Sequence, residues 1–205
     1  AIGHTSILLA FVAALIGVAS PLIAARFEPE RFRAAARYSI FGQFVLVTLA
    51  ALALIYGLVN TDFSIKYVAF NTTRATPTYY RVTGLWGALE GSLLLWEWLL
   101  IIFAGIVAWT YRNRHHEMMP WVVMIFSIVS LFFLGVIGFL SNPFETVSPI
   151  PLDGRGLNPL LEDANMMTHP PLLYTGFVGL TVPFAFAMAA LIVGKVDEAW
   201  IKTTR

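Results

Sequence analysis

Five long apolar runs set the strictest limit on what this chain can fold into. They occupy residues 7–25, 38–59, 91–111, 120–140 and 170–194, and the only charge within them is Glu97. Each run is near the roughly 20 residues that cross a hydrocarbon core as a helix, and none alternates like a strand of a membrane barrel. Because only helices and closed barrels satisfy their backbone polar groups in lipid, we predict five transmembrane helices.

The composition supports an all-α, polytopic integral membrane protein. Charged residues make up 12% of the chain, whereas a soluble domain carries about 25%. We treat residues 1–205 as a single membrane domain with two long segments outside the helices, 60–90 and 141–169. Loops of this length are usually functional, so we expect the function on their face. The chain has no cysteine, which excludes disulfides and thiolate ligands.

The basic residues are divided unevenly between the two ends of the predicted helices. Nine of the thirteen flank one end: Arg26, Arg31, Arg33, Arg37, Arg112, Arg114, Lys195, Lys202 and Arg205. The positive-inside rule places this end in the cytoplasm, with the N-terminus outside and the C-terminus cytoplasmic. We interpret the short basic connections as orientation signals beside anionic lipid. The lipid bilayer is therefore a predicted partner, and nucleic acid is not.

The stretch "NMMTHPPLLYTG" (165–176) places His169 directly before two prolines. The residue before a proline is biased away from the helical region, and proline is favoured in a first helical turn. We therefore expect His169 to be the last non-helical residue, with Pro170 and Pro171 opening the fifth helix. The positive end of the helix dipole would keep the imidazole neutral, and a neutral imidazole can bind a metal such as haem iron. A helix-capping histidine is the alternative, and the residues alone favour it.

Glu97 is the second unusual residue, because an acid inside a membrane span is costly and usually faces a bundle interior or a water-filled cavity. On a continuous helix, Trp86, Glu90 and Glu97 would fall within about 40° of one another. Glu90, near the membrane surface, suits a pair with Arg81 or Arg74. For Glu97 the open alternatives are proton conduction, substrate contact and a structural pair.

Aromatic residues gather on the predicted outer face and near the ends of the spans. Tyr79, Tyr80, Trp86 and Tyr174 belong to the outer group. They either stack on a flat ligand such as a porphyrin or form an interfacial belt, and their spacing does not decide between these roles. Trp109 and Trp121 fit the role of interface anchors at span ends.

Two stretches carry a resemblance to a known family. "YYRVTGLWGALEGSLLLWEW" (79–98) and "GRGLNPLLEDANMMTHPPLLYTGFVGLTVPFAFAMAAL" (154–191) closely resemble the CcmF family of cytochrome c-type biogenesis proteins, the membrane haem lyases. The likeness runs through essentially all 205 residues. It implies that the histidine of HPPLLY, here His169, is an external axial ligand to the iron of the haem being attached. Further positions that match the family motifs, with supporting roles only, are Pro170, Pro171, Tyr174, Trp86 and Glu90.

The resemblance also implies a reaction, partners and a location. Members of the family take haem from the haem chaperone CcmE. With CcmH-type subunits, they join its vinyl groups to the two cysteines of a CxxCH segment in apocytochrome c. We therefore expect a multi-pass protein of the bacterial cytoplasmic (inner) membrane, with its functional loops on the periplasmic side. The acidic haem propionates need cationic partners, and the outer-face candidates are Arg74, Arg81 and Arg155.

Several features of the family are absent from this chain. They are the tryptophan-rich WWD segment, a second external histidine and the histidine pair that holds a resident b-type haem. The chain therefore resembles the N-terminal five-helix part of a haem lyase. We expect the remainder of the lyase to be its partner, and we expect this part to be inactive alone.

Two other functions compete with the haem lyase. One is a proton-conducting or transporter-like module centred on Glu97, and the other is a structural subunit that scaffolds a partner. Transporters usually show internal symmetry or helices broken at mid-membrane, and neither is visible in the sequence.

Overall fold

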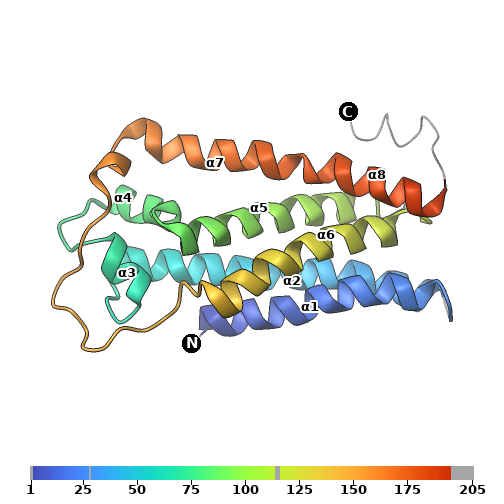
Figure 1. Ribbon diagram of the computed structural model, residues 1–205, viewed down its shortest axis with the longest axis horizontal. Helices are drawn as coiled ribbons and strands as arrows, with labels where there is room; N and C mark the ends of the chain where they lie inside the picture. Colours follow the sequence, from blue (N-terminus) through green and yellow to red (C-terminus); the bar gives the residue numbers. More distant parts are fainter. Residues whose placement is uncertain (1, 28, 114–115, 195–205) are drawn as a thin grey trace.

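The computed structural model describes residues 2–27, 29–113 and 116–194, and the predictions for Arg114, Lys195, Lys202 and Arg205 lie outside these residues. Five helical spans are long and apolar enough to cross a membrane, so the predicted all-α membrane fold is confirmed. They are α1 (Ile2–Ala24), α2 (Pro29–Val59), α5 (Leu89–Thr110), α6 (Met119–Gly135) and the pair α7 (Ala164–Gly179) and α8 (Thr181–Val193). A π-helical turn, η2 (Val136–Leu140), continues α6. The helices run along the long axis of the molecule (Figure 1).

Helices α1, α2 and α6 approach one another closely through small residues. One face of α1 buries Ala10, Ala14 and Gly17. A Cβ atom added at Gly17 would lie 2.2 Å from Ser127 Oγ of α6 and 2.7 Å from Ser39 Oγ of α2. Small residues allow this approach, because lipid provides no hydrophobic drive for helices to associate and close packing must replace it. α6 also packs against α5 and α8 and is the most buried of the five spans.

The two predicted outer segments include several short helices. They contain α3 (Lys66–Asn71), α4 (Thr78–Thr83), η1 (Gly84–Trp86) and η3 (Pro159–Leu161). α3, α4 and the start of α7 lie at the same end of the bundle, on the left of Figure 1. This end is called the outer end below. The buried Tyr67 hydroxyl donates to Gly84 O (2.8 Å) and accepts from Ala88 N (3.2 Å). Burial raises the pKa of Tyr67, so this hydroxyl stays neutral and anchors α3 to the start of α5.

The fifth span differs from the prediction in two respects. α7 begins before Pro170, because the Asp163 side chain caps it by accepting a hydrogen bond from Asn165 N (2.8 Å). The span is also broken at Leu180, between α7 and α8. Pro183, in the first turn of α8, has no N–H to donate to a carbonyl in the last turn of α7. Because this run is apolar throughout, its sequence gives no sign of the break between the two helices.

Candidate functional site

His169 lies in the second turn of α7, and its side chain is exposed. The prediction that it is the last non-helical residue is wrong, because Asp163 already caps the helix. For the same reason His169 is not a helix cap. Within the part of the chain that the structure describes, its ring makes no hydrogen bond. Both ring nitrogens are therefore available to a ligand at this end of the bundle.

The two prolines lie inside α7 instead of opening it. Pro170 has no N–H, so the carbonyl of Met166, four residues earlier, receives no helical hydrogen bond. The indole Nε1–H of Trp86 donates to this carbonyl at 3.4 Å, which ties α7 to η1. Trp86 belongs to η1 and precedes α5, so the continuous helix that would have aligned it with Glu97 does not exist.

The sequence suggested that Tyr174 is one of the outer-face aromatic residues, but its side chain faces α5 instead. Its ring stacks on Trp96 of α5, with the ring centroids 5.3 Å apart and the planes at 25°. This contact fixes α7 against α5. At the outer end, the Tyr80 hydroxyl donates to Glu162 O at 2.9 Å, which holds α4 against the segment that leads into α7.

Arg81 donates hydrogen bonds to backbone carbonyls at the outer end. Its guanidinium donates to three carbonyls, those of Thr76 (2.7 Å), Val59 (2.9 Å) and Arg74 (2.8 Å). The predicted pair with Glu90 does not form, because these carbonyls take the arginine's nitrogens. Arg81 therefore fixes the turn between α3 and α4 to the end of α2.

The other two candidate arginines are exposed and lie over aromatic rings. The Arg155 guanidinium is 3.9 Å from the centre of the Phe70 ring, and that of Arg74 is 5.8 Å from the centre of the Phe63 ring. Glu90 is half-buried and lines an outer cavity of about 260 Å³ beside α3. The structure thus places the arginines around α3, while His169 lies on α7.

Glu97 is fully buried within the bundle, away from the outer end. Ser130 Oγ lies 2.5 Å from Glu97 Oε1 and 2.9 Å from Gln43 Oε1. The Gln43 amide donates to Ser39 O (3.3 Å) and to Ser127 Oγ (3.5 Å). This polar network connects α5, α6 and α2 in a region that is otherwise apolar.

The number of hydrogen-bond donors in this network favours a neutral Glu97. A serine hydroxyl has a single hydrogen, so an ionised Glu97 and the Gln43 carbonyl would compete for the one on Ser130. A protonated Glu97 can donate to Ser130, which then donates to Gln43, and each bond has one donor. Among the described residues, Glu97 Oε2 is the buried side-chain atom left without a partner. Glu97 therefore acts as a link between helices.

The family model described as "Cytochrome C assembly protein" matches residues 86–203. The chain belongs to this family. The chain is also 39% identical over 205 residues to the cytochrome c-type biogenesis protein CcmF of Haemophilus influenzae, covering 100% of this chain and 32% of that protein. The CcmF of Escherichia coli is 40% identical over 205 residues, with 100% and 32% covered.

A solved structure gives the same relationship in three dimensions. The protein named cytochrome c heme lyase CcmF is 30% identical to this chain and superimposes on it with a TM-score of 0.83, and the match covers 99% of this chain and 32% of that protein. The chain thus spans about a third of the length of the relatives that it matches.

Two residues that anchor the outer end, Asp163 and Tyr67, were missed in the sequence. Asp163 carries an ordinary signal, because aspartate is a favoured N-cap residue, but the prolines drew the predicted helix start to a later position. Tyr67 carries none, because its partners Gly84 and Ala88 follow 17 and 21 residues later. Only the folded outer end brings them together.

Acidification should loosen the outer end at Asp153. Its carboxylate accepts hydrogen bonds from Arg74 N (2.9 Å) and Gly154 N (2.8 Å), and these bonds lower the pKa of Asp153. A lowered folded-state pKa contributes stability above the unfolded value of about 3.9, and this contribution is lost as the pH falls through the folded value. The Arg74 amide should therefore lose protection from hydrogen exchange, corrected for intrinsic rates, as the pH falls below about 5 and through the lowered pKa of Asp153. Asp153→Asn should abolish this dependence, and unchanged wild-type protection would contradict the prediction.

Proposed function

We propose that this chain is part of a cytochrome c haem lyase and holds haem at the periplasmic face of the bacterial inner membrane during its attachment to apocytochrome c. The observation that carries the proposal is His169, an exposed imidazole without a hydrogen bond in the described residues. It lies on a helix of a family member whose relatives are named cytochrome c-type biogenesis proteins. Haem is the substrate in this proposal.

His169 would bind the haem iron from one side as an axial ligand. Trp86 and Tyr174 hold α7 in place, so the position of the imidazole is set before haem arrives. The haem vinyl groups then face the two thiols of the CxxCH segment. Each thioether would form by addition of a thiol across the vinyl double bond: the S–H bond breaks, sulfur bonds to one vinyl carbon, and the hydrogen goes to the other carbon. Holding the reactants in position can supply several kcal/mol of the barrier, and we assign no general acid or base.

The reaction needs partners beyond this chain. The proposed partners are the haem chaperone CcmE, CcmH-type subunits, apocytochrome c and the remaining part of the lyase, which would supply the second iron ligand and a resident b-type haem. Arg74 and Arg155 are the proposed partners of the propionates, because their guanidinium groups are exposed at the outer end. Arg81 is a weaker candidate, since it already donates to three carbonyls.

The alternative function, a proton-conducting module around Glu97, receives less support. Glu97 is fully buried and hydrogen-bonded to Ser130, and none of the three cavities described for the chain includes it. The break at Leu180 is a feature that transporters share, but it lies on α7 and α8, outside the Glu97 network.

Replacing His169 with glycine tests the function directly. The complete protein, purified with haem-loaded chaperone, should lose its external haem absorption and its cytochrome c maturation, because one iron ligand is missing. Added imidazole should restore the haem spectrum, since it can occupy the space of the lost ring. Rescue by imidazole separates loss of a ligand from loss of folding.

Two outcomes would count against these assignments. Unchanged haem absorption in His169→Gly, with the protein folded, would remove His169 from the site. Normal haem retention in an Arg74→Ala and Arg155→Ala double variant would remove these arginines while leaving His169 in place.

A further inference from the structure

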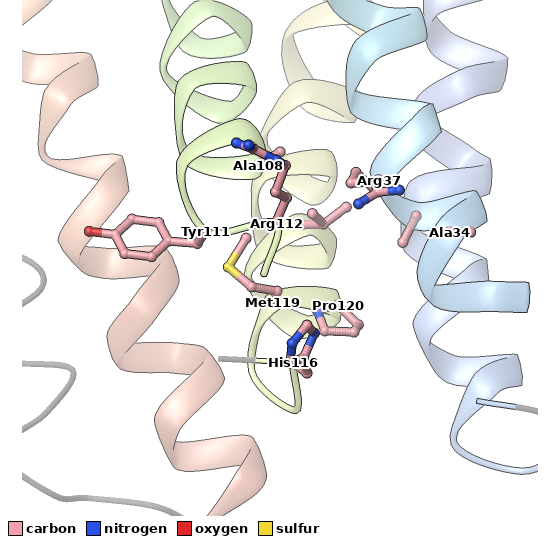
Figure 2. A pocket seen from close by; sticks show the side chains of 10 residues that line it. Ala34, Arg37, Ala108, Tyr111, Arg112, His116, Met119 and Pro120 are labelled. Atoms are coloured by element: carbon pink, nitrogen blue, oxygen red, sulfur yellow. The ribbon is translucent and has the colours of Figure 1, made fainter. Parts of the chain in front are cut away.

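A cavity of about 390 Å³ lies at the end of the bundle opposite to His169. It is bounded by α2, by the end of α5 and by the connection into α6, and Figure 2 shows its lining side chains. Its volume falls within the range of small-molecule sites, which is roughly 300–1,000 Å³. The haem proposal makes no use of this cavity.

Cationic and apolar groups line the cavity. Arg37, Arg112 and His116 supply the cationic and titratable side chains, and no aspartate or glutamate is among the lining residues that the structure describes. Arg112 uses one N–H to cap α5, donating from Nη1 to Trp109 O at 3.0 Å. Arg37 makes no hydrogen bond within the described residues, and its guanidinium lies 5.4 Å from the centre of the Tyr38 ring. Most of the N–H groups of both arginines therefore remain free to bind an anion.

The residues around the cavity are typical of a membrane surface. Trp109, at the end of α5, is 61% exposed and has the Arg112 guanidinium 4.6 Å from its ring centre, an arrangement typical of an interface anchor. The apolar part of the lining comes from Ala36, Ala108 and Val123. Charged and apolar groups thus meet in one hollow, a combination that suits the depth of the lipid headgroups.

From these observations we propose that this cavity binds the phosphate of an anionic phospholipid. Guanidinium groups match phosphate oxygens in geometry and charge, and the apolar lining suits the glycerol and the first carbons of the acyl chains. Basic pockets between transmembrane helices bind anionic headgroups. A lipid reaches the cavity along the membrane surface, whereas free phosphate would gain nothing from the apolar lining. The bound lipid would link α2 to the α5–α6 connection.

The test uses the complete natural protein, delipidated in mild detergent. Phosphatidylglycerol or inorganic phosphate is added, and bound molecules are counted by native mass spectrometry. We expect one phosphatidylglycerol to bind saturably. Combining Arg37→Gln with Arg112→Gln should weaken its binding about 25-fold, at about fivefold for each cation removed. Arg26→Gln removes an exposed arginine at the same end but outside the cavity, so it should leave binding unchanged.

The remaining outcomes decide against the proposal or identify another source of the anion. Equal retention of phosphatidylglycerol by wild type and the double glutamine variant would overturn it. Binding of inorganic phosphate with no preference for the lipid would overturn the assignment to a phospholipid. If the double variant unfolds, the single variants decide, because unchanged affinity in both contradicts the proposal. Replacing both arginines with lysine should retain part of the binding, since the charges are kept but the forked geometry of the guanidinium groups is lost.

Discussion

Replacing Glu97 with alanine should lower the free energy of unfolding by about 2–4 kcal/mol, whereas glutamine should cost less than about 1 kcal/mol. Alanine leaves a cavity in the bundle and deprives Ser130 of one of its two hydrogen-bond partners. Glutamine keeps the shape of the side chain, and its amide can donate to Ser130 as the protonated carboxyl does. The effect is large because Glu97, Gln43, Ser127 and Ser130 are all fully buried, where no water can replace a lost partner.

The measurement is the unfolding temperature and aggregation onset of the full protein in detergent. Glu90→Ala is the matched control, because Glu90 is an acid on the same helix but only half-buried, and it should change stability little. If Glu97→Gln is as damaging as Glu97→Ala, the carboxyl has a role beyond hydrogen bonding, and the proton-conducting alternative regains support. If neither variant changes stability, the network does not hold the helices together.

Replacing Gly91 with alanine should disrupt the outer end at a cost of about 3 kcal/mol. A Cβ atom added there would lie 2.0 Å from Leu85 O and 2.3 Å from Tyr67 Oη. Because a backbone carbonyl cannot turn aside, α5 must move, and the Tyr67 hydrogen bonds to Gly84 and Ala88 must break. The shift would also displace Trp86, which lies in η1 beside this contact.

Thermal stability and haem retention together test this prediction. Gly176→Ala is the control, because a Cβ atom there meets nothing within 4 Å, and alanine favours a helix over glycine by roughly 1 kcal/mol. The control should therefore keep or raise stability, while Gly91→Ala lowers both stability and haem retention. An unchanged outer end in Gly91→Ala would mean that the contact to Leu85 is looser than the structure shows.

The sequence alone determined the fold class, because lipid makes backbone hydrogen bonding a local requirement. Each apolar run had to satisfy its own N–H and C=O groups, so counting run lengths was sufficient to find five spans. The same locality explains why the family motif around His169 could be read from adjacent residues. The charge of Glu97 was also visible, but its partners were not, since Ser130 lies 33 positions away.

Only the tertiary structure decided where the functional residues lie relative to the helices. Pro170 leaves the carbonyl of Met166 without a helical hydrogen bond, and Trp86, 80 positions from Met166, donates to that carbonyl instead. Tyr174 was expected on the outer face, but its ring stacks on Trp96 of α5. Arg81 was expected to pair with Glu90, yet three backbone carbonyls from separate segments take its nitrogens. In each case the deciding partner comes from a distant part of the chain, and a preference of neighbouring residues is too weak to resist such a contact.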